Sequence, residues 1–311
     1  RQKGMVFRMA KYSKQDILDL IEEEDIEFIR LQFTDIAGNL KNMAATIDQI
    51  DKILNGKCKF DCAAIDGFRG KGYEELFLIP DLDTFVIFPW RPQHGKVARF
   101  ICDVVKPDGT PFEGDSRYIL KRAINQAKEM GFELDVAIKS EFFLFDLDEN
   151  GEPTNHTTEK GGYFDIGPTD GGENTRRDMV LYLADMGIEV ESSYHSDEAA
   201  QHVLDLSHVD ALSMADDIMT TRLVVRTVAR RHGCHGTFMP KPKENVKGSG
   251  AHYTFSVCKD GKNIFSDSSD ELGVSKEGYQ FMTGILRHIA SMTLVNNPIV
   301  NSYKRLIPGY L

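Results

Sequence analysis

Residues 134–147 read LDVAIKSEFFLFDL, a run in which aliphatic and aromatic residues predominate. Such a run predicts a long β-strand. Side chains alternate between the two faces of a strand, so Lys139 and Glu141 are expected on the same face. That face of the predicted sheet is the first candidate for a functional site.

A second predicted strand, residues 251–258, places His252, Thr254 and Ser256 on one face. It follows the turn Gly248-Ser249-Gly250, where backbone without side chains can approach a ligand closely. By itself the turn is more typical of plain turn geometry than of a ligand loop, and both interpretations stay open.

The first hundred residues predict a small β-rich domain. Ser13, with Asp16 three residues later, caps an amphipathic helix that ends near Glu24. Strand-like runs then alternate with Gly, Asp and Pro turns. These runs are residues 26–33, 40–47, 84–90 and 97–105.

The turn cluster at residues 106–111 marks the predicted domain boundary, so we expect domains at 9–108 and 109–311. Beyond it, helices are predicted at 116–130, 174–186, 213–232 and 276–295, and further strands at 188–192 and 235–239. Gly187 and Gly233 end two of the helices in the position that glycine favours. Helices and strands mix without βαβ alternation, so the predicted class is α+β.

Composition excludes several classes of protein. The chain of 311 residues is 41% hydrophobic and 27% charged, as in globular proteins, and its net charge of −11 disfavours nucleic acid and anionic membranes as partners. No apolar run approaches the roughly 20 residues of a membrane span, so a cytosolic location is expected. The five scattered cysteines indicate reduced thiols. A zinc site at Cys58 and Cys62 is a weaker alternative, because no second pair lies nearby.

The two ends of the sequence carry their own expectations. Residues 1–8 are interpreted as an extension or a cloning scar before Met9. The last residues, Pro308 to Leu311, close no predicted helix or strand, so the chain looks cut at this point.

Eight short motifs follow one another along the chain. They are Phe33-Thr34-Asp35, Phe60-Asp61, Pro80-Asp81-Leu82-Asp83-Thr84, Glu141-Phe142-Phe143-Leu144-Phe145, Gly161-Gly162-Tyr163-Phe164-Asp165, Phe238-Met239-Pro240-Lys241-Pro242, Gly248-Ser249-Gly250-Ala251-His252 and Asn301-Ser302-Tyr303-Lys304-Arg305. In order and spacing these motifs resemble type I glutamine synthetase. The resemblance implies an N-terminal β-grasp domain and an incomplete catalytic domain. It also implies a reaction in which ATP phosphorylates glutamate and ammonia displaces the phosphate, supported by two Mg²⁺ or Mn²⁺ ions.

Most metal-ligand positions implied by the resemblance have changed. The family's Glu-Pro-Glu-Phe, His-His-Glu and Gln-His-Glu motifs read Lys139-Ser140-Glu141-Phe142, Tyr194-His195-Ser196 and Gln201-His202-Val203. Glu141 and His252 remain as expected ligands, whereas Lys139, Ser196 and Val203 replace carboxylates. A further ligand and several nucleotide-contacting arginines would follow residue 311.

Replacement of three carboxylates by Lys, Ser and Val changes the charge from −3 to +1, a difference of +4. Two divalent cations carry the same charge. We therefore hypothesise a pocket that is balanced without metal, since clustered carboxylates without cations repel one another. Undirected decay of an unselected gene copy is the alternative.

The resemblance assigns roles to five further residues. Asp61 matches an ammonium-site residue offered to a neighbouring subunit, Glu191 and Ser256 match nucleotide-side positions, and Gly248 and Arg305 match glutamate-side positions. Other positions depart from the family, namely Cys62-Ala63-Ala64, Lys243, Lys247 and Leu311. For Arg305 a plain ion pair, and for His252 a core position, are the structural alternatives.

Three functions are consistent with the sequence. One is a glutamine synthetase-like protein that is catalytically impaired or inactive and binds glutamate or ATP weakly, or assembles with an active subunit. Another is a working glutamate–ammonia ligase or related γ-glutamyl ligase. The third is a fragment without a function of its own. The resemblance implies ring assembly, so a homo-oligomer or co-assembly with a glutamine synthetase is expected, as single rings or dimers.

Overall fold

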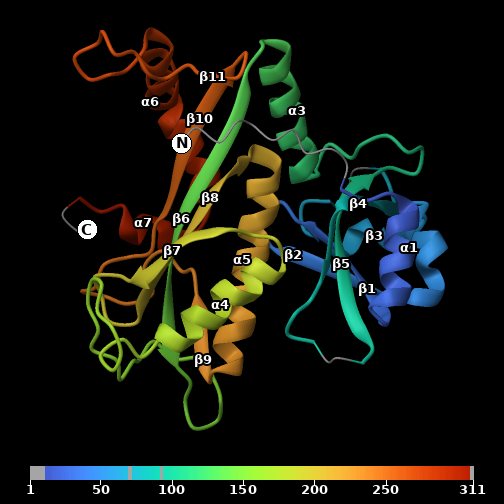
Figure 1. The fold of residues 1–311 in the computed structure, drawn as a ribbon, viewed down its shortest axis with the longest axis horizontal. Helices are drawn as coiled ribbons and strands as arrows, with labels where there is room; N and C mark the ends of the chain where they lie inside the picture. Colours follow the sequence, from blue (N-terminus) through green and yellow to red (C-terminus); the bar gives the residue numbers. More distant parts are fainter. Residues whose placement is uncertain (1–10, 69–71, 92–93, 309–311) are drawn as a thin grey trace. The chain divides into compact units, whose positions relative to one another are not determined.

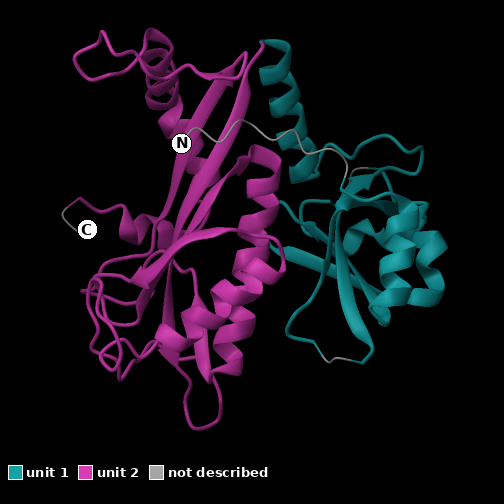
Figure 2. Ribbon diagram, in the orientation of Figure 1, with its two compact units in different colours: residues 1–130 teal, residues 131–311 magenta. Residues whose placement is uncertain are grey.

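A computed structural model describes residues 11–68, 72–91 and 94–308 (Figure 1). The chain divides into two compact units, residues 1–130 and residues 131–311 (Figure 2). Each unit combines helices with a largely antiparallel sheet, which confirms the predicted α+β class. A boundary after residue 108 stays a prediction. The expectations for Met9 and for Gly309 to Leu311 concern residues outside the described ranges.

Unit 1 is built on a five-stranded sheet in the order β2-β1-β5-β4-β3, in which β1 and β5 are parallel and the other pairs antiparallel. The strands are β1 (Ile26–Thr34), β2 (Leu40–Thr46), β3 (Cys58–Asp61), β4 (Glu75–Ile87) and β5 (Lys96–Val105). The helices are α1 (Lys14–Glu23), α2 (Ile50–Leu54) and α3 (Ser116–Glu129). Aromatic rings fill the core, with Phe68 in edge contact with Phe112 at 4.9 Å.

The predicted cap of the first helix is confirmed. The Ser13 hydroxyl accepts a hydrogen bond from the Asp16 amide at 3.2 Å, and the Asp16 carboxylate accepts one from the Ser13 amide at 2.6 Å. Two amides that the first turn leaves unpaired are thereby satisfied. Ile17 and Ile21, one turn apart, bury the apolar face of this helix.

The strand predicted at residues 84–90 is wrong in its limits, because β4 begins at Glu75 and ends at Ile87. Pro80 was interpreted as part of a turn but lies within the strand. Strand β3, which the sequence analysis missed, pairs only with residues 75–78 of β4. Pro80 lies beyond that pairing, so β3 does not require the amide hydrogen that proline lacks.

Unit 2 is built on a second sheet in the order β11-β10-β6-β8-β7, with β9 also paired to β6. The strands are β6 (Glu133–Asp146), β7 (Val190–His195), β8 (Gln201–Asp210), β9 (Cys234–Thr237), β10 (Ala251–Lys259) and β11 (Lys262–Asn263). The helices are α4 (Glu173–Asp185), α5 (Ala211–Arg231), α6 (Lys276–Asn296) and α7 (Val300–Arg305). Among the described residues, no helix is both long and apolar enough to cross a membrane.

Sequence reasoning located the unit 2 helices better than its strands. Gly187 and Gly233 follow α4 and α5 with φ of 79° and 74°, as predicted for residues that end helices. Strand β8 was missed, and the strand expected at 188–192 is β7, which begins and ends two to three residues later. Strand β8 begins with Gln201 and His202, which are buried although polar.

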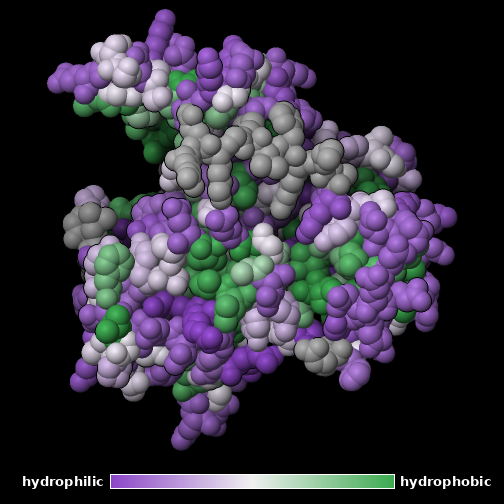
Figure 3. Space-filling view, viewed as in Figure 1, coloured by the Kyte–Doolittle hydropathy of each residue, from purple (hydrophilic) through white to green (hydrophobic). Residues whose placement is uncertain are grey.

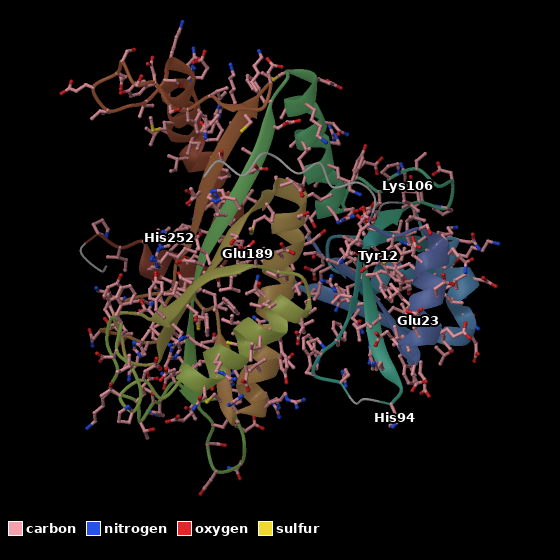
Figure 4. The ribbon with its side chains drawn as sticks, viewed as in Figure 1. Tyr12, Glu23, His94, Lys106, Glu189 and His252 are labelled. Carbon is pink, nitrogen blue, oxygen red and sulfur yellow. The ribbon has the colours of Figure 1, made fainter. Side chains whose placement is uncertain are left out.

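Asp115 provides a test of the packing of unit 1. Its buried carboxylate caps α3 by accepting from the Arg117 amide and also accepts from the Val104 amide of β5, both at 3.0 Å. Asp115→Ala removes a helix cap and leaves a buried strand amide without this partner, so we expect a loss of about 2 kcal/mol in unfolding free energy. Urea denaturation of the variant measures this loss. Glu23→Ala, on the exposed side of α1 (Figure 4), is the control and should change stability by less than about 0.5 kcal/mol. Equal effects of the two substitutions would contradict the assignment.

Candidate active site

Strand register brings several of the predicted site residues together on one face of the unit 2 sheet. Lys139 on β6 lies directly between His252 on β10 and Asp205 on β8. Two residues along, Glu141 lies opposite Val203, which lies opposite Tyr194 on β7. The face predicted from period-two alternation is therefore formed by four adjacent strands.

Glu141 is held by the turn that precedes β10. Its Oε2 accepts a hydrogen bond from the Gly250 amide at 2.6 Å, and its backbone amide donates to the Gly250 carbonyl at 3.0 Å. The other carboxylate oxygen lies 3.6 Å from Nε2 of His252, whose side chain is 57% exposed. Figure 4 shows His252 on β10, close to the short helix α7.

Arg305 of α7 reaches the same turn. A Cβ on Gly250 would lie 3.0 Å from a guanidinium nitrogen of Arg305, and one on Gly248 would lie 2.9 Å from its Cδ. Glycine at both positions therefore makes room for the arginine. Asn301, one turn earlier in α7, fixes this helix through paired hydrogen bonds with the Lys241 backbone at 2.7 and 2.9 Å.

Lys139 has its own partners on this face. Its Nζ lies 5.2 Å from the centre of the Tyr194 ring, and a hydrogen bond with Tyr194 raises the pKa of Lys139. Burial raises the pKa of Tyr194. The lysine is therefore an ammonium ion and the tyrosine a neutral phenol at physiological pH.

The remaining predicted residues lie at different places. Ser196 is buried just beyond β7, whereas Val203, opposite Glu141, is fully buried within β8. Ser256 on β10 accepts from Asn263 at 3.0 Å, whereas Glu191 is exposed on β7, three strand spacings or about 14 Å across the sheet. Asp61 belongs to unit 1, at the end of β3, where it accepts from the Ala63 amide at 2.7 Å. The site assignments of these residues stay predictions.

Two polar atoms around the turn lack a protein partner. Oε1 of Gln201 and the hydroxyl of Ser249 are buried without a hydrogen bond, although Nε2 of Gln201 donates to the Gly248 carbonyl at 3.2 Å. Buried polar atoms are normally paired, so these two have capacity for a polar ligand or water. A separate open hollow of about 700 Å³, lined by residues such as Asp270, Tyr279 and Arg287, contains none of the predicted site residues.

Both units match family models of known proteins. Residues 25–107 match the model "Glutamine synthetase, beta-Grasp domain", and residues 113–311 match "Glutamine synthetase, catalytic domain". The chain belongs to the glutamine synthetase family. This confirms the resemblance inferred from the eight motifs, including the β-grasp domain.

Individual relatives agree with the family assignment. A glutamine synthetase from Clostridium saccharobutylicum is 56% identical over 302 residues, which are 97% of this chain and 68% of the relative. One from Staphylococcus aureus strain Mu50 is 49% identical, over 96% of this chain and 67% of the relative. The chain thus spans about two thirds of the length of these glutamine synthetases.

Solved structures show the same fold. The Plasmodium falciparum glutamine synthetase superposes with a TM-score of 0.87 at 25% identity, covering 98% of this chain and 65% of that one. A GmaS/ADP complex gives a TM-score of 0.85 at 29% identity, covering 94% and 67%.

The opposite face of the glutamine synthetase sheet carries a polar cluster that sequence reasoning missed. His195 on β7 and His202 on β8 are directly paired in register and fully buried, and Glu159 reaches both of them. One ligand atom from each residue lies within 4.8 Å of the others, a spacing compatible with a metal ion. Two histidines at paired positions of adjacent strands would have been the signal, but β8 had not been recognised.

The hydrogen-bond partners do not fit a metal. A guanidinium only donates, so Nδ1 of His202 accepts from Arg176 at 2.8 Å, and the proton of the neutral imidazole lies on Nε2, the atom that faces Glu159. A metal ligand would need a lone pair there. Arg176 is fixed in turn by two hydrogen bonds to Asp170, at 2.6 and 3.0 Å. We therefore interpret the cluster as a buried polar network, in which Nε2 of His202 faces Glu159 without a hydrogen bond.

His202 predicts a pH-dependent stability. Burial, followed by the charges of Arg176 and His195, lowers the pKa of His202 well below 6.5. Below pH 6.5 the unfolded chain therefore takes up a proton at His202 that the folded chain excludes. The contribution of this residue to the unfolding free energy is fully present above pH 6.5 and falls below it by up to about 1.4 kcal/mol per pH unit. Burial raises the pKa of Glu159. All the variants compared contain this residue, so a difference between their pH profiles does not come from its substitution.

The measurement is urea denaturation between pH 7.5 and 5.5 for the native chain and two variants. His202→Gln keeps an acceptor for Arg176 and removes the titrating group, so its loss on acidification should be smaller. His208→Gln makes the same substitution at an exposed position of β8 and should retain the native dependence. Identical pH profiles for all three proteins would contradict the prediction.

Proposed function

We propose that this chain is a glutamine synthetase-like protein in which the Lys139 ammonium takes the place of divalent metal charge, and that it binds a carboxylate-bearing small molecule with little or no ligase activity. The observation that supports this most is the position of Lys139, directly opposite His252 and two residues from Glu141 on the same face. The family reaction itself, ATP-dependent ligation of ammonia to glutamate, remains the chemical context of the site.

The charges of the retained residues disfavour two divalent ions. Cβ atoms of directly opposite residues on paired strands lie about 5 Å apart, so a metal held by His252 would lie within several ångströms of the Lys139 side chain. A divalent cation and an ammonium about 6 Å apart repel by about 5 kcal/mol at an effective dielectric constant of about 20. The Gly250 amide already supplies Glu141 with a charge-assisted hydrogen bond. We therefore assign no step of a reaction to bound metal.

Several groups on the same face suit a carboxylate ligand. The Arg305 guanidinium lies against the bare backbone of Gly248 and Gly250, and Gln201 and Ser249 carry unpaired polar atoms nearby. A guanidinium beside accessible backbone recognises a carboxylate in bidentate geometry. Glutamate, the substrate of the family reaction, is the ligand we propose. A role for Asp61, Glu191 or Ser256 toward ammonium or nucleotide remains part of the proposal.

An active glutamate–ammonia ligase is the second candidate, favoured by the 56% identity to a protein named glutamine synthetase. Turnover in a phosphate-release assay with ATP, glutamate, ammonia and Mn²⁺ distinguishes this active ligase from the ligand-binding protein proposed above.

A non-catalytic partner within a homo-oligomer or a mixed assembly is a further form of the first proposal, and such a partner would also show no turnover in that assay. The cytosolic location stays a prediction.

Metal binding is the first prediction of the proposal. Isothermal titration with Mn²⁺ should show no stoichiometric binding to the native chain. Lys139→Glu replaces a repelling charge by a ligand and should raise Mn²⁺ affinity at least tenfold, and adding Ser196→Glu and Val203→Glu should raise it further. Lys128→Glu, an exposed change of equal charge on α3, should have no effect.

The single variant keeps the test decisive even if glutamate at the buried Val203 position prevents folding. Tight Mn²⁺ binding by the native chain together with turnover would refute the proposal and favour the active ligase. An equal increase in Mn²⁺ affinity from Lys139→Glu and Lys128→Glu would mean that overall charge, and not the site, determines binding.

Glutamate binding is the second prediction. Titration of the native chain with L-glutamate in the absence of divalent metal should show saturable binding, and Arg305→Ala should weaken it at least tenfold because the carboxylate loses its guanidinium partner. Arg230→Ala, in the exposed last turn of α5, is the matched control and should bind as the native chain does. Absence of binding to the native chain would refute a glutamate pocket.

A further inference from the structure

The loop between β7 and β8, residues 196–200, is fastened to the residue that precedes the turn of the candidate site. Nζ of Lys247 lies 2.6 Å from the carboxylate of Asp197. The backbone amide of Lys247 donates to the carboxylate of Glu198 at 3.0 Å. Two consecutive residues of the loop therefore bind this lysine, one through its side chain and the other through its backbone.

The β7–β8 loop has a fixed conformation of its own. The Ser196 amide donates to the Gln201 carbonyl at 2.7 Å, and the Gln201 amide donates to the Glu198 carbonyl at 2.9 Å. Ala200 is fully buried with φ of 64°, and its carbonyl accepts from the Leu144 amide of β6 at 2.9 Å. Because the loop is attached to its own strands and to β6, it can serve as a support for the turn.

The turn at residues 248–250 depends on such attachments for its position. Two of its three residues are glycine, whose backbone loses more conformational freedom on ordering than that of any other residue. Hydrogen bonds attach Gly248 to Gln201 and Gly250 to Glu141. The contacts of the preceding lysine with the β7–β8 loop add an attachment at the start of the turn.

Lys247 is also a cation among carboxylates. Its hydrogen bond to Asp197 and the charge of that residue raise the pKa of Lys247, and the charges of Glu198 and Glu141 act in the same direction. The side chains of the ion pair are 47% and 46% exposed. In Figure 3 hydrophilic atoms predominate at the lower left of the view, where Figure 1 places the loops at the end of β7. Exposed ion pairs contribute modestly, so we expect effects of about two- to fivefold.

We propose that Lys247 is a positioning residue, which fastens the turn to the β7–β8 loop and so holds the Gly250 backbone where it meets Glu141 and Arg305. The lysine acts through the turn, because Asp197 engages its ammonium group. The proposal rests on the proposed function, in which this turn belongs to the glutamate site.

Two substitutions that remove opposite charges test the proposal. Lys247→Met and Asp197→Asn each break the ion pair, so each should speed hydrogen exchange at residues 248–250 of the ligand-free chain about two- to fivefold. Mass spectrometry measures this exchange. Lys262→Met, at an exposed position of β11, is the matched control and should leave the exchange unchanged.

Glutamate affinity separates positioning from long-range attraction. If charge alone acts on the anionic ligand, loss of a positive and loss of a negative charge should change the affinity in opposite directions. If Lys247 positions the turn, both substitutions should weaken binding about two- to fivefold. The double variant should then bind no more weakly than either single one, because both remove the same contact. Isothermal titration with L-glutamate measures these affinities.

Two results would overturn the proposal. One is unchanged hydrogen exchange at the turn in both single variants, and the other is a change of glutamate affinity in opposite directions. Absence of glutamate binding to the native chain would instead refute the proposed function, whereas exchange in the ligand-free chain would still decide whether Lys247 holds the turn. The two proposals therefore fail separately.

Discussion

The period-two alternation of side chains along β6 sets the layout of unit 2. This strand pairs with β8, β9 and β10, so each of its faces is continued by residues of several neighbours. Lys139 and Glu141 point to the face of the candidate site, whereas Ile138 and Phe142 are buried on the other. The candidate site therefore occupies one face of the middle of β6, and further along the same face Phe143 and Phe145 pack in a small core cluster.

The fold accommodates the residues that the proposal places at former ligand positions. Val203 is fully buried and Ser196 is buried, so both are accommodated without an unpaired charge in the interior. Lys139 would be costly if isolated, but Tyr194 and the opposite Asp205 lie beside it.

The sequence predicted the fold class and most helices because capping residues and helical periodicity are local signals. Strands were harder. The first half of β4 was not predicted because it contains Pro80. A strand tolerates proline only where the neighbouring strand does not need its amide hydrogen, and the sequence does not show how far that neighbour extends. The polar residues Gln201 and His202 concealed β8, because their partners Glu141, Gly248 and Arg176 are distant in sequence. The convergence of Arg305 on Gly250 likewise depends on tertiary packing, and only the resemblance indicated it.

Adjacent residues of β8 bear on the two explanations offered for the residues at the implied ligand positions, namely undirected decay and replacement of metal charge. His202 keeps the residue of the motif that the resemblance implies and lies on the other face, where its Nδ1 accepts from Arg176, which Asp170 holds in turn. Val203, which the resemblance places at a carboxylate position, pairs with Glu141 on the face of the candidate site. Undirected substitution would strike both faces of a strand alike, and an unpaired charge in the buried network would cost several kcal/mol. Under the proposal that Val203 stands in place of a carboxylate, the buried network beside it favours a chain that is still constrained to fold.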